Sequence, residues 1–119
     1  MDVILLSRDL MLLARTQGAA NQLGIRLRNA NSVAQASEFV ADGATLGVVI
    51  DLRTPGLNIQ ATVSDIRASR PNNLIIAACG PHVHEGALQA AREAGCDVVA
   101  TRGQFDRDAE AILGAMIAS

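Results

Sequence analysis

The chain has 119 residues, enough for one domain with a single core. Half of its residues are apolar and only 2% are aromatic, which predicts an aliphatic core of helices packed on a sheet. The net charge of −2 and the lack of a basic block argue against nucleic-acid binding by this domain. No apolar run approaches the length of a membrane span. We therefore expect one soluble, cytoplasmic domain over residues 1–119.

The first third of the chain predicts a strand, a helix and a second strand. Residues 3–6 are continuously apolar, as in a fully buried strand. Asp9 can cap a following helix that ends at Gly24. The expected inward face of this helix is Leu10, Leu13, Ala20 and Leu23. Residues 25–29 then alternate between apolar and polar side chains, which is typical of an edge strand with one solvated face.

A second helix and a third strand come next. Ser32 and Gln35 have the spacing of a capping box, which predicts a helix that runs to Gly43. Residues 46–50 form an apolar strand, and Asp51 closes it. This arrangement places a carboxylate at the end of a strand built for burial, which makes Asp51 the first candidate functional residue.

The second half of the chain repeats the alternation. Asn58 can cap a third helix, whose apolar face is Ile59, Val63 and Ile66. Pro71, Asn72 and Asn73 are expected to break the chain before a fourth strand at residues 74–78.

The last two helices flank a fifth strand at residues 98–101. Pro81 fits the first position of the fourth helix, which Gly95 would end. Its expected buried stripe is Val83, Ala87, Ala90 and Ala94, and the last helix is expected to bury Phe105, Ala109, Ile112, Leu113 and Met116.

This alternation predicts the α/β class, with a doubly wound, five-stranded parallel sheet and helices on both faces. The polar alternation of the second strand suits an edge position, which favours the strand order 2-1-3-4-5. Sites in such sheets form at the carboxyl ends of the strands. The candidate site residues gathered there are Ser7, Arg8, Asp9, Asp51, Arg53, Cys79, Gly80 and Arg102.

Four features along the chain together resemble the receiver domain of two-component response regulators, a flavodoxin-like (CheY-like) family. They are the apolar strand ending in Asp51, Pro55 four residues later, the pair Ala94 and Gly95 before the fifth strand, and Arg102 after it. The resemblance covers essentially the whole chain. It implies that Asp51 occupies the position that accepts a phosphoryl group from a histidine kinase.

The chain departs from the family pattern at the other functional positions. Two acidic residues that bind Mg²⁺ in the family are replaced by Ser7 and Arg8. The hydroxyl residue at the end of the fourth strand becomes Gly80, or Cys79 if the loop is one residue longer. Arg102 stands in place of a lysine, and an aromatic residue of the fifth strand becomes an aliphatic one, at Val99. These departures imply a degenerate pseudo-receiver.

The departures remove much of the expected phosphorylation chemistry. Mg²⁺ requires several oxygen ligands, and one carboxylate beside a serine is a poor set. Arg8 and Arg53 are expected to place guanidinium groups where the metal would sit and to pair with Asp51. We therefore predict a non-enzymatic signalling module without a cofactor. It would act by contact with a protein partner, or by self-association, through the face of the fourth helix, fifth strand and fifth helix.

Two other functions remain open from the sequence. The first is an active response regulator phosphorylated on Asp51, which would require Mg²⁺. The second is a flavodoxin-like binder of a nucleotide or flavin. That function needs a phosphate-binding loop after the first strand, and the segment SRDLM, residues 7–11, lacks its glycines. The chain also has no Tyr or Trp on which a ring could stack.

The cysteines and histidines are expected to have structural or solvated roles. Cys79 and Cys96 lie at opposite ends of adjacent predicted strands, roughly 16 Å apart at about 3.3 Å per residue. A disulfide needs Cα atoms within about 7 Å, so both thiols are predicted to be free. His82 and His84 occupy alternate positions at a helix start, which do not face one way, so solvated side chains are favoured over a metal site.

Overall fold

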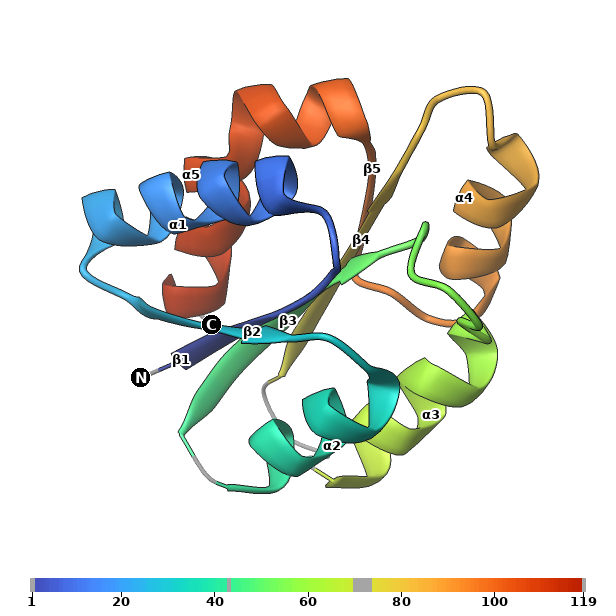
Figure 1. Cartoon of the computed structure of the whole chain (residues 1–119), viewed down its shortest axis with the longest axis horizontal. Helices are drawn as coiled ribbons and strands as arrows, with labels where there is room; N and C mark the ends of the chain where they lie inside the picture. The colour runs from blue at the N-terminus through green and yellow to red at the C-terminus, as the bar shows by residue number, and fades with distance from the viewer. Residues whose placement is uncertain (1, 43, 70–73, 119) are drawn as a thin grey trace.

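The computed structural model describes residues 2–42, 44–69 and 74–118. Within these ranges, five strands alternate with five helices (Figure 1). The strands are β1 (Asp2–Leu6), β2 (Arg26–Ala30), β3 (Thr45–Asp51), β4 (Ile75–Gly80) and β5 (Val98–Thr101). The helices are α1 (Leu10–Leu23), α2 (Val33–Ala41), α3 (Ile59–Ser69), α4 (Glu85–Glu93) and α5 (Arg102–Ala118).

The five strands form one parallel sheet in the order β2-β1-β3-β4-β5. The register pairs Leu6 with Ile50 and Asp51 with Cys79, so the carboxyl ends of the central strands align at one edge. The predicted fold class, strand order and edge position of β2 are confirmed. The alignment also brings the loops after β1 and β3 together, which is the condition for a site at this edge.

Helices cover both faces of the sheet, α1 and α5 on one and α2, α3 and α4 on the other (Figure 1). The central strands feed both cores because successive side chains point to opposite faces. In β1, Val3 and Leu5 pack under α1 and α5, whereas Ile4 and Leu6 pack under the other layer. A strand buried on both faces must be apolar throughout, which explains the continuous run at residues 3–6.

The helix starts follow the capping side chains that the sequence predicted. Asp9 accepts hydrogen bonds from the amides of the first turn of α1, Ser32 accepts one from the amide of Gln35, and Asn58 caps α3. Gly24 ends α1 with a positive φ of 68°, which a residue without Cβ adopts at little cost. The predicted helix end at Gly43 and the break at Pro71, Asn72 and Asn73 lie outside the described residues.

The predicted inward face of α1 is wrong at its first residue. Leu10 is 79% exposed, and the buried residues of the helix are Leu12, Thr16, Ala19 and Ala20. The hydroxyl of Thr16 donates to the carbonyl oxygen of Leu12 at 2.7 Å, so a polar residue enters this face without an unsatisfied group. A hydropathy pattern does not predict the burial of a threonine. The face predicted from apolar residues alone therefore included Leu10 and missed Thr16.

The predicted start of α4 is also wrong. Pro81 lies in a turn in which the amide of His84 donates to the Pro81 carbonyl oxygen at 2.9 Å, and the helix begins at Glu85. Val83 is 69% exposed, and Leu88 and Ala91 are the buried residues of the helix. The later start turns the helix so that Ala87, Ala90 and Ala94 are only half-buried.

The burial predicted for α5 is confirmed at Phe105, Ala109, Leu113 and Met116, and Ile112 is half-buried. Gly47 lets this helix approach the sheet. A Cβ at that position would lie 2.3 Å from the Met116 sulfur and 2.8 Å from the carbonyl oxygen of Ile75.

Arg15 joins α1 to α5. Its guanidinium donates to both carboxylate oxygens of Glu110 at 3.1 Å and to the main-chain oxygen of Asp106 at 2.7 Å. The hydrogen bond and charge of Arg15 lower the pKa of Glu110 below its usual range.

Two of the residues of the edge strand β2 are arginines, Arg26 and Arg28. Arg26 is exposed, and the Arg28 guanidinium lies 3.8 Å from the centroid of the Phe39 ring, a cation–π contact. Arg28 also lies 3.6 Å from an Asp42 carboxylate oxygen. These contacts hold the Arg28 side chain against the end of α2 and leave the open edge of the sheet charged.

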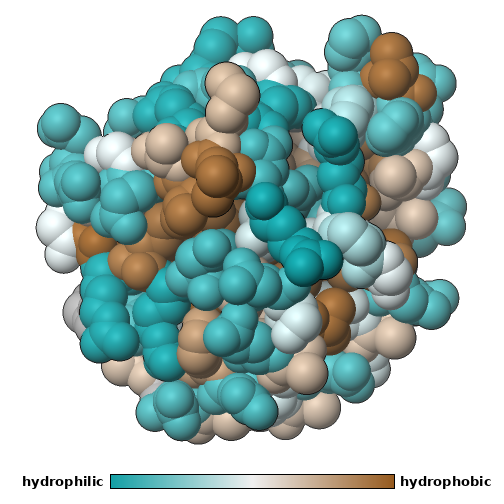
Figure 2. All heavy atoms as spheres, in the orientation of Figure 1, coloured by the Kyte–Doolittle hydropathy of each residue, from teal (hydrophilic) through white to brown (hydrophobic). Residues whose placement is uncertain are grey.

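Hydrophilic side chains cover most of the face seen in Figure 2, with an apolar area on the side of α1. The most exposed large apolar side chains among the described residues are Leu10, Met11, Val83 and Ile117. In the part of the chain that the structure describes, no helix is both long enough and apolar enough to cross a membrane. Cys79 and Cys96 are free, as predicted, and His82 and His84 are exposed.

Candidate functional site

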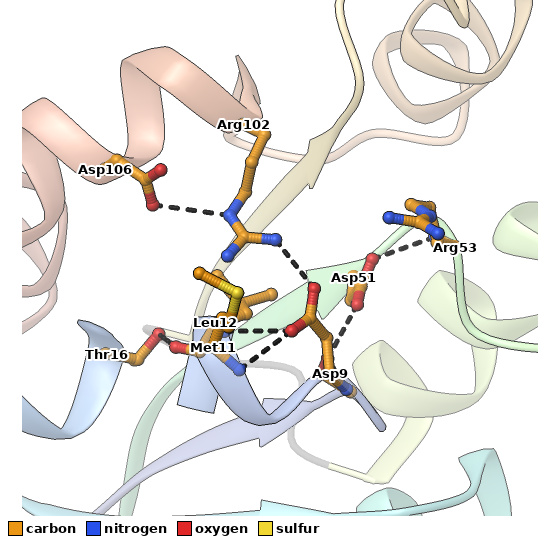
Figure 3. A network of polar contacts seen from close by, with 9 residues as sticks. Asp9, Met11, Leu12, Thr16, Asp51, Arg53, Arg102 and Asp106 are labelled. Carbon is orange, nitrogen blue, oxygen red and sulfur yellow. Dashed lines mark hydrogen bonds and ion pairs between the residues drawn. The ribbon is translucent and has the colours of Figure 1, made fainter. Parts of the chain in front are cut away.

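Asp51 is the last residue of β3, and its side chain is held by neutral donors. One carboxylate oxygen accepts a hydrogen bond from the Ser7 hydroxyl at 2.6 Å. The other accepts one from the main-chain amide of Arg53 at 2.9 Å (Figure 3). Asp51 is only 5% exposed. A carboxylate at this depth must be hydrogen-bonded, and these two donors meet that need.

Ser7 connects the loop after β1 to the end of β3. Its hydroxyl donates to Asp51 and also accepts from the amide of Asp9 at 3.0 Å. The main chain of Ser7 is fixed as well, because its amide donates to the Ala30 carbonyl oxygen and its own carbonyl accepts from the Asn29 side chain at 3.1 Å. The serine hydroxyl therefore has a fixed place and little freedom to turn toward a ligand.

Asp9 is held between a helix end and an arginine. One carboxylate oxygen accepts from the amides of Met11 and Leu12, the first turn of α1, and the other accepts from Arg102 at 2.8 Å (Figure 3). The hydrogen bond from Arg102, supported by the amide of Leu12, lowers the pKa of Asp9 below its ordinary value of 3.8. Asp9 is therefore ionised at neutral pH and fully engaged.

Arg102 begins α5 and joins that helix to the loop after β1. Besides Asp9, its guanidinium donates to Asp106 one helical turn further on, at 3.3 Å. Figure 3 shows the resulting chain of charges from Asp106 through Arg102 to Asp9. Arg102 and Asp9 were predicted at this edge and Asp106 was not, although the spacing of four residues between Arg102 and Asp106 is the signal that predicts such a pair.

A cavity of about 290 Å³ opens beside Asp51. Its lining residues are Arg8, Asp9, Asp51, Arg53, Thr54 and Pro55. Thr54 is buried and donates its hydroxyl to the main-chain oxygen of Asp51 at 2.7 Å, which tightens the turn after β3. The predicted site residues of the β1 and β3 loops thus meet around one space, and Thr54 joins them without having been named from the sequence.

The predicted ion pair between Asp51 and an arginine is wrong. Among the described residues, no ion pair joins Asp51 to Arg8 or Arg53, and both arginines are exposed. Arg53 contacts Asp51 only through its main-chain amide. The physical reason is that Ser7 and this amide already satisfy the carboxylate, so no cation is needed to bury it.

Cys79 and Gly80 lie at the same edge of the sheet but outside the lining of the cavity. Both are buried, and the amide of Leu52 donates to the Cys79 carbonyl oxygen at 2.9 Å. The Leu52 side chain covers Gly80, since a Cβ there would lie 3.2 Å from it. Cys79 packs among the core residues, and burial, helped by the charge of Asp51, raises the pKa of its thiol to about 12.

The donor set at Asp51 does not fit Mg²⁺. In the described part of the chain, no three His, Cys, Asp or Glu side chains are grouped so that they could hold a metal. Each of the two nearby carboxylates already has its own donors, Asp51 from Ser7 and Asp9 from Arg102. A hard cation would find only these two carboxylates in the cavity lining, both already hydrogen-bonded, beside two arginines.

No protein-family model and no curated protein matches this chain. Solved structures do match in shape. The receiver domain of NtrX from Brucella abortus is 16% identical with a TM-score of 0.84, and the match covers 99% of each chain. The receiver domain of the sensor histidine kinase PA1611 from Pseudomonas aeruginosa PAO1 is 18% identical with a TM-score of 0.83, over 99% of this chain and 98% of that one.

The chain has the fold of a receiver domain. It spans 26% of a longer NtrX chain from Brucella abortus, with 16% identity and a TM-score of 0.82, so there the receiver fold is one part of a larger protein. The PA1611 receiver domain was solved with a magnesium ion coordinated in its active-site cleft. In the present chain, Ser7 and Arg8 follow β1 at the carboxyl edge of the sheet.

Proposed function

We propose that residues 1–119 form a single receiver-like signalling domain that acts by protein–protein contact and has lost Mg²⁺-dependent phosphorylation of Asp51. The fold supports a signalling role, because solved structures of this shape include receiver domains at nearly full coverage. Fold alone does not determine function, so the site must carry the rest of the proposal.

The observation that carries the proposal is the set of partners around Asp51. Phosphoryl transfer depends on cations that neutralise the charge developing on the transferred group. Here the residues after β1 supply a serine hydroxyl to Asp51 and an arginine to the cavity, and Asp9, the other carboxylate of the cavity lining, is bound by Arg102. Asp51 is thus built into a hydrogen-bonded network in which Ser7 links two loops.

The experiment is a phosphorylation assay read by intact-protein mass spectrometry. The protein is incubated with acetyl phosphate and Mg²⁺, beside a receiver domain of known activity and beside Asp51→Asn. We expect no added phosphoryl group on the wild-type protein under conditions that fully modify the control domain. A stable mass gain that Asp51→Asn abolishes would overturn the proposal.

The second candidate is an active phosphoacceptor at Asp51. It is favoured by one observation, which is that Asp51 lies at the end of β3 in the lining of an open cavity. In that case Mg²⁺ would be the required cofactor, and Ser7 would have to release the Asp51 carboxylate. The same assay separates the two candidates, because only this one predicts a mass gain that depends on both Mg²⁺ and Asp51.

We propose that partner binding or self-association uses the face of α4, β5 and α5. Supporting features are the 69% exposure of Val83 and a cavity of about 590 Å³ lined in part by Leu88, Arg92 and Thr101. The mass in solution, measured by light scattering over a concentration series, tests self-association. If it occurs here, Val83→Glu should shift the equilibrium to the monomer, and Leu10→Glu, on the exposed side of α1, should not.

A further inference from the structure

We propose that the cavity beside Asp51 binds a phosphate monoester without covalent reaction, held between the guanidinium groups of Arg8 and Arg53. The inference rests on the proposed function, because a metal-loaded and phosphorylated Asp51 would fill the same space. The proposed ligand of this cavity is an anion, whereas a metal site would bind a cation.

The carboxylates of the cavity do not need a cation. Asp51 is hydrogen-bonded by Ser7 and by the amide of Arg53, and Asp9 is bound by Arg102 and the first turn of α1. Each negative group is therefore stabilised within the protein. A divalent cation entering the cavity would gain little from them and would face two positive side chains.

The two arginines are in the opposite situation. Arg8 and Arg53 both line the cavity, one from the loop after β1 and the other from the loop after β3. Within the described ranges, neither guanidinium forms a hydrogen bond or an ion pair, whereas Arg15, Arg67 and Arg102 are all paired with carboxylates.

A phosphate monoester fits this arrangement better than a simple monovalent anion. It carries a charge of about −1.5 to −2 at neutral pH and three acceptor oxygens, enough for two guanidinium forks at once. The cavity volume of about 290 Å³ also leaves room for the organic part of an ester. The charges of the lining residues cancel formally, so the binding should be modest and should weaken as salt is added.

The phosphate could belong to a free small molecule or to a phosphorylated side chain of a protein partner. Both present the same chemistry to Arg8 and Arg53. They differ in what surrounds the phosphate, because a partner would also touch residues outside the cavity, whereas a small molecule would contact only its lining.

The test is a titration followed by two-dimensional amide NMR at constant ionic strength. The probes are inorganic phosphate, phenyl phosphate, and a short peptide with one phosphoserine beside its unphosphorylated twin. We expect saturable shifts at the amides of residues 7–9 and 53–55. Arg8→Gln and Arg53→Gln should each weaken the binding about five- to tenfold, an effect consistent with the loss of one charge-assisted hydrogen bond.

Arg107→Gln is the matched control. Arg107 is an exposed arginine of α5 outside the cavity lining, so its loss changes the net charge equally. The variants at Arg8 and Arg53 alter exposed side chains, and Arg53→Gln keeps the main-chain amide that binds Asp51. Unchanged dispersion of the amide spectrum verifies that each variant is folded before its affinity is compared.

Each outcome decides the proposal. Tightest binding of the phosphopeptide supports it with a protein partner as the source, and tightest binding of phenyl phosphate supports it with a small-molecule ester. The proposal is overturned if no phosphate gives saturable shifts, if inorganic phosphate binds at least as tightly as both esters, if the unphosphorylated peptide binds as well as its phosphorylated twin, or if Arg107→Gln weakens binding as much as the cavity variants do. A failure here, with no phosphorylation of Asp51 by acetyl phosphate, removes this inference and leaves the proposed function standing.

Discussion

An arginine–aspartate pair lies at each end of the parallel strands, but the groups around the two pairs differ. At the amino edge, Arg67 donates to the carbonyl oxygens of Leu74 and Gly95 and pairs with Asp97 at 2.9 Å. Asp97 in turn accepts from the amide of Ile76. These hydrogen bonds join the Arg67 and Asp97 side chains to the main chain near the amino ends of β4 and β5, so the pair links these two strands.

At the carboxyl edge, Arg102 and Asp9 form an equally short pair of 2.8 Å, beside a cavity. Two further arginines line that cavity without a partner among the described residues. The difference shows that an ion pair alone does not mark a site. In our proposal, the two arginines without a protein partner among the described residues mark the carboxyl edge as the place where a ligand binds.

The largest effect is expected from Ser7→Asp, which puts a second carboxylate where the hydroxyl now donates to Asp51 at 2.6 Å. Two buried like charges at this separation should lower the free energy of unfolding by about 3 kcal/mol. Added Mg²⁺ should restore part of it, because the paired carboxylates create a ligand set. Urea unfolding with and without Mg²⁺ measures both effects.

Ser64→Asp on the exposed side of α3 is the control for this substitution. It should change the stability little and should not respond to Mg²⁺. If Ser7→Asp were as stable as the wild type without metal, the hydrogen bond from Ser7 to Asp51 would not be the contact that holds this edge together.

Arg67→Gln tests the other edge. The substitution removes donors from two main-chain carbonyls and leaves Asp97 without its cation. We expect a loss of about 2 kcal/mol in the free energy of unfolding, measured by urea denaturation, with no change in phosphate binding. Weaker phosphate binding by this variant would show that the two edges are coupled, and the contrast between them would fail.

Asp9→Asn should have a smaller effect, because asparagine can still cap α1 and only the charge paired with Arg102 is lost. The pair is partly exposed, so we expect a cost of about 1 kcal/mol near pH 7. The folded pKa of Asp9 is lowered, so its contribution is present above the ordinary pKa and is lost as the pH falls through the folded value. The stability difference between variant and wild type should therefore shrink in acid, as urea unfolding at several pH values would show.

The smallest effect concerns the two thiols. Burial raises the pKa of Cys79 to about 12 and that of Cys96 to about 11, so little thiolate of either exists at pH 8. We expect slow alkylation of the folded protein, with Cys96 modified before the more deeply buried Cys79. Peptide mapping after a timed reaction measures the order, and faster modification of Cys79 would show that the end of β4 opens readily.

The sequence was sufficient for the fold because its strong signals are local. The apolar run at residues 3–6, the caps at Asp9, Ser32 and Asn58, and the glycine at residue 24 each act within one element. The strand order followed from the one strand with a polar face. The errors at Leu10 and Pro81 concern rotation and start of a helix, which depend on packing between elements.

The candidate site was predictable in its location and less so in its contacts. The alignment of strand ends correctly brought Arg8, Asp9, Asp51 and Arg53 around one cavity. The partner of Asp51 was wrong because charge complementarity suggested an arginine, whereas a hydroxyl and an amide lay closer. The choice between neutral and charged donors depends on how the loops after β1 and β3 pack together, which a sequence does not contain.

The arginines of β2 have a consequence for the behaviour of the protein at high concentration. β2 lies at the open edge of the sheet, where unpaired main-chain groups could accept a strand from another molecule. Arg26 projects into solvent from this strand, and Arg28 is held over Phe39. Both arginines also lie within 3.9 Å of the Asp2 carboxylate, and a second copy pairing at this edge would have to remove these charged groups from water. The charged edge thus protects the domain against β-sheet aggregation.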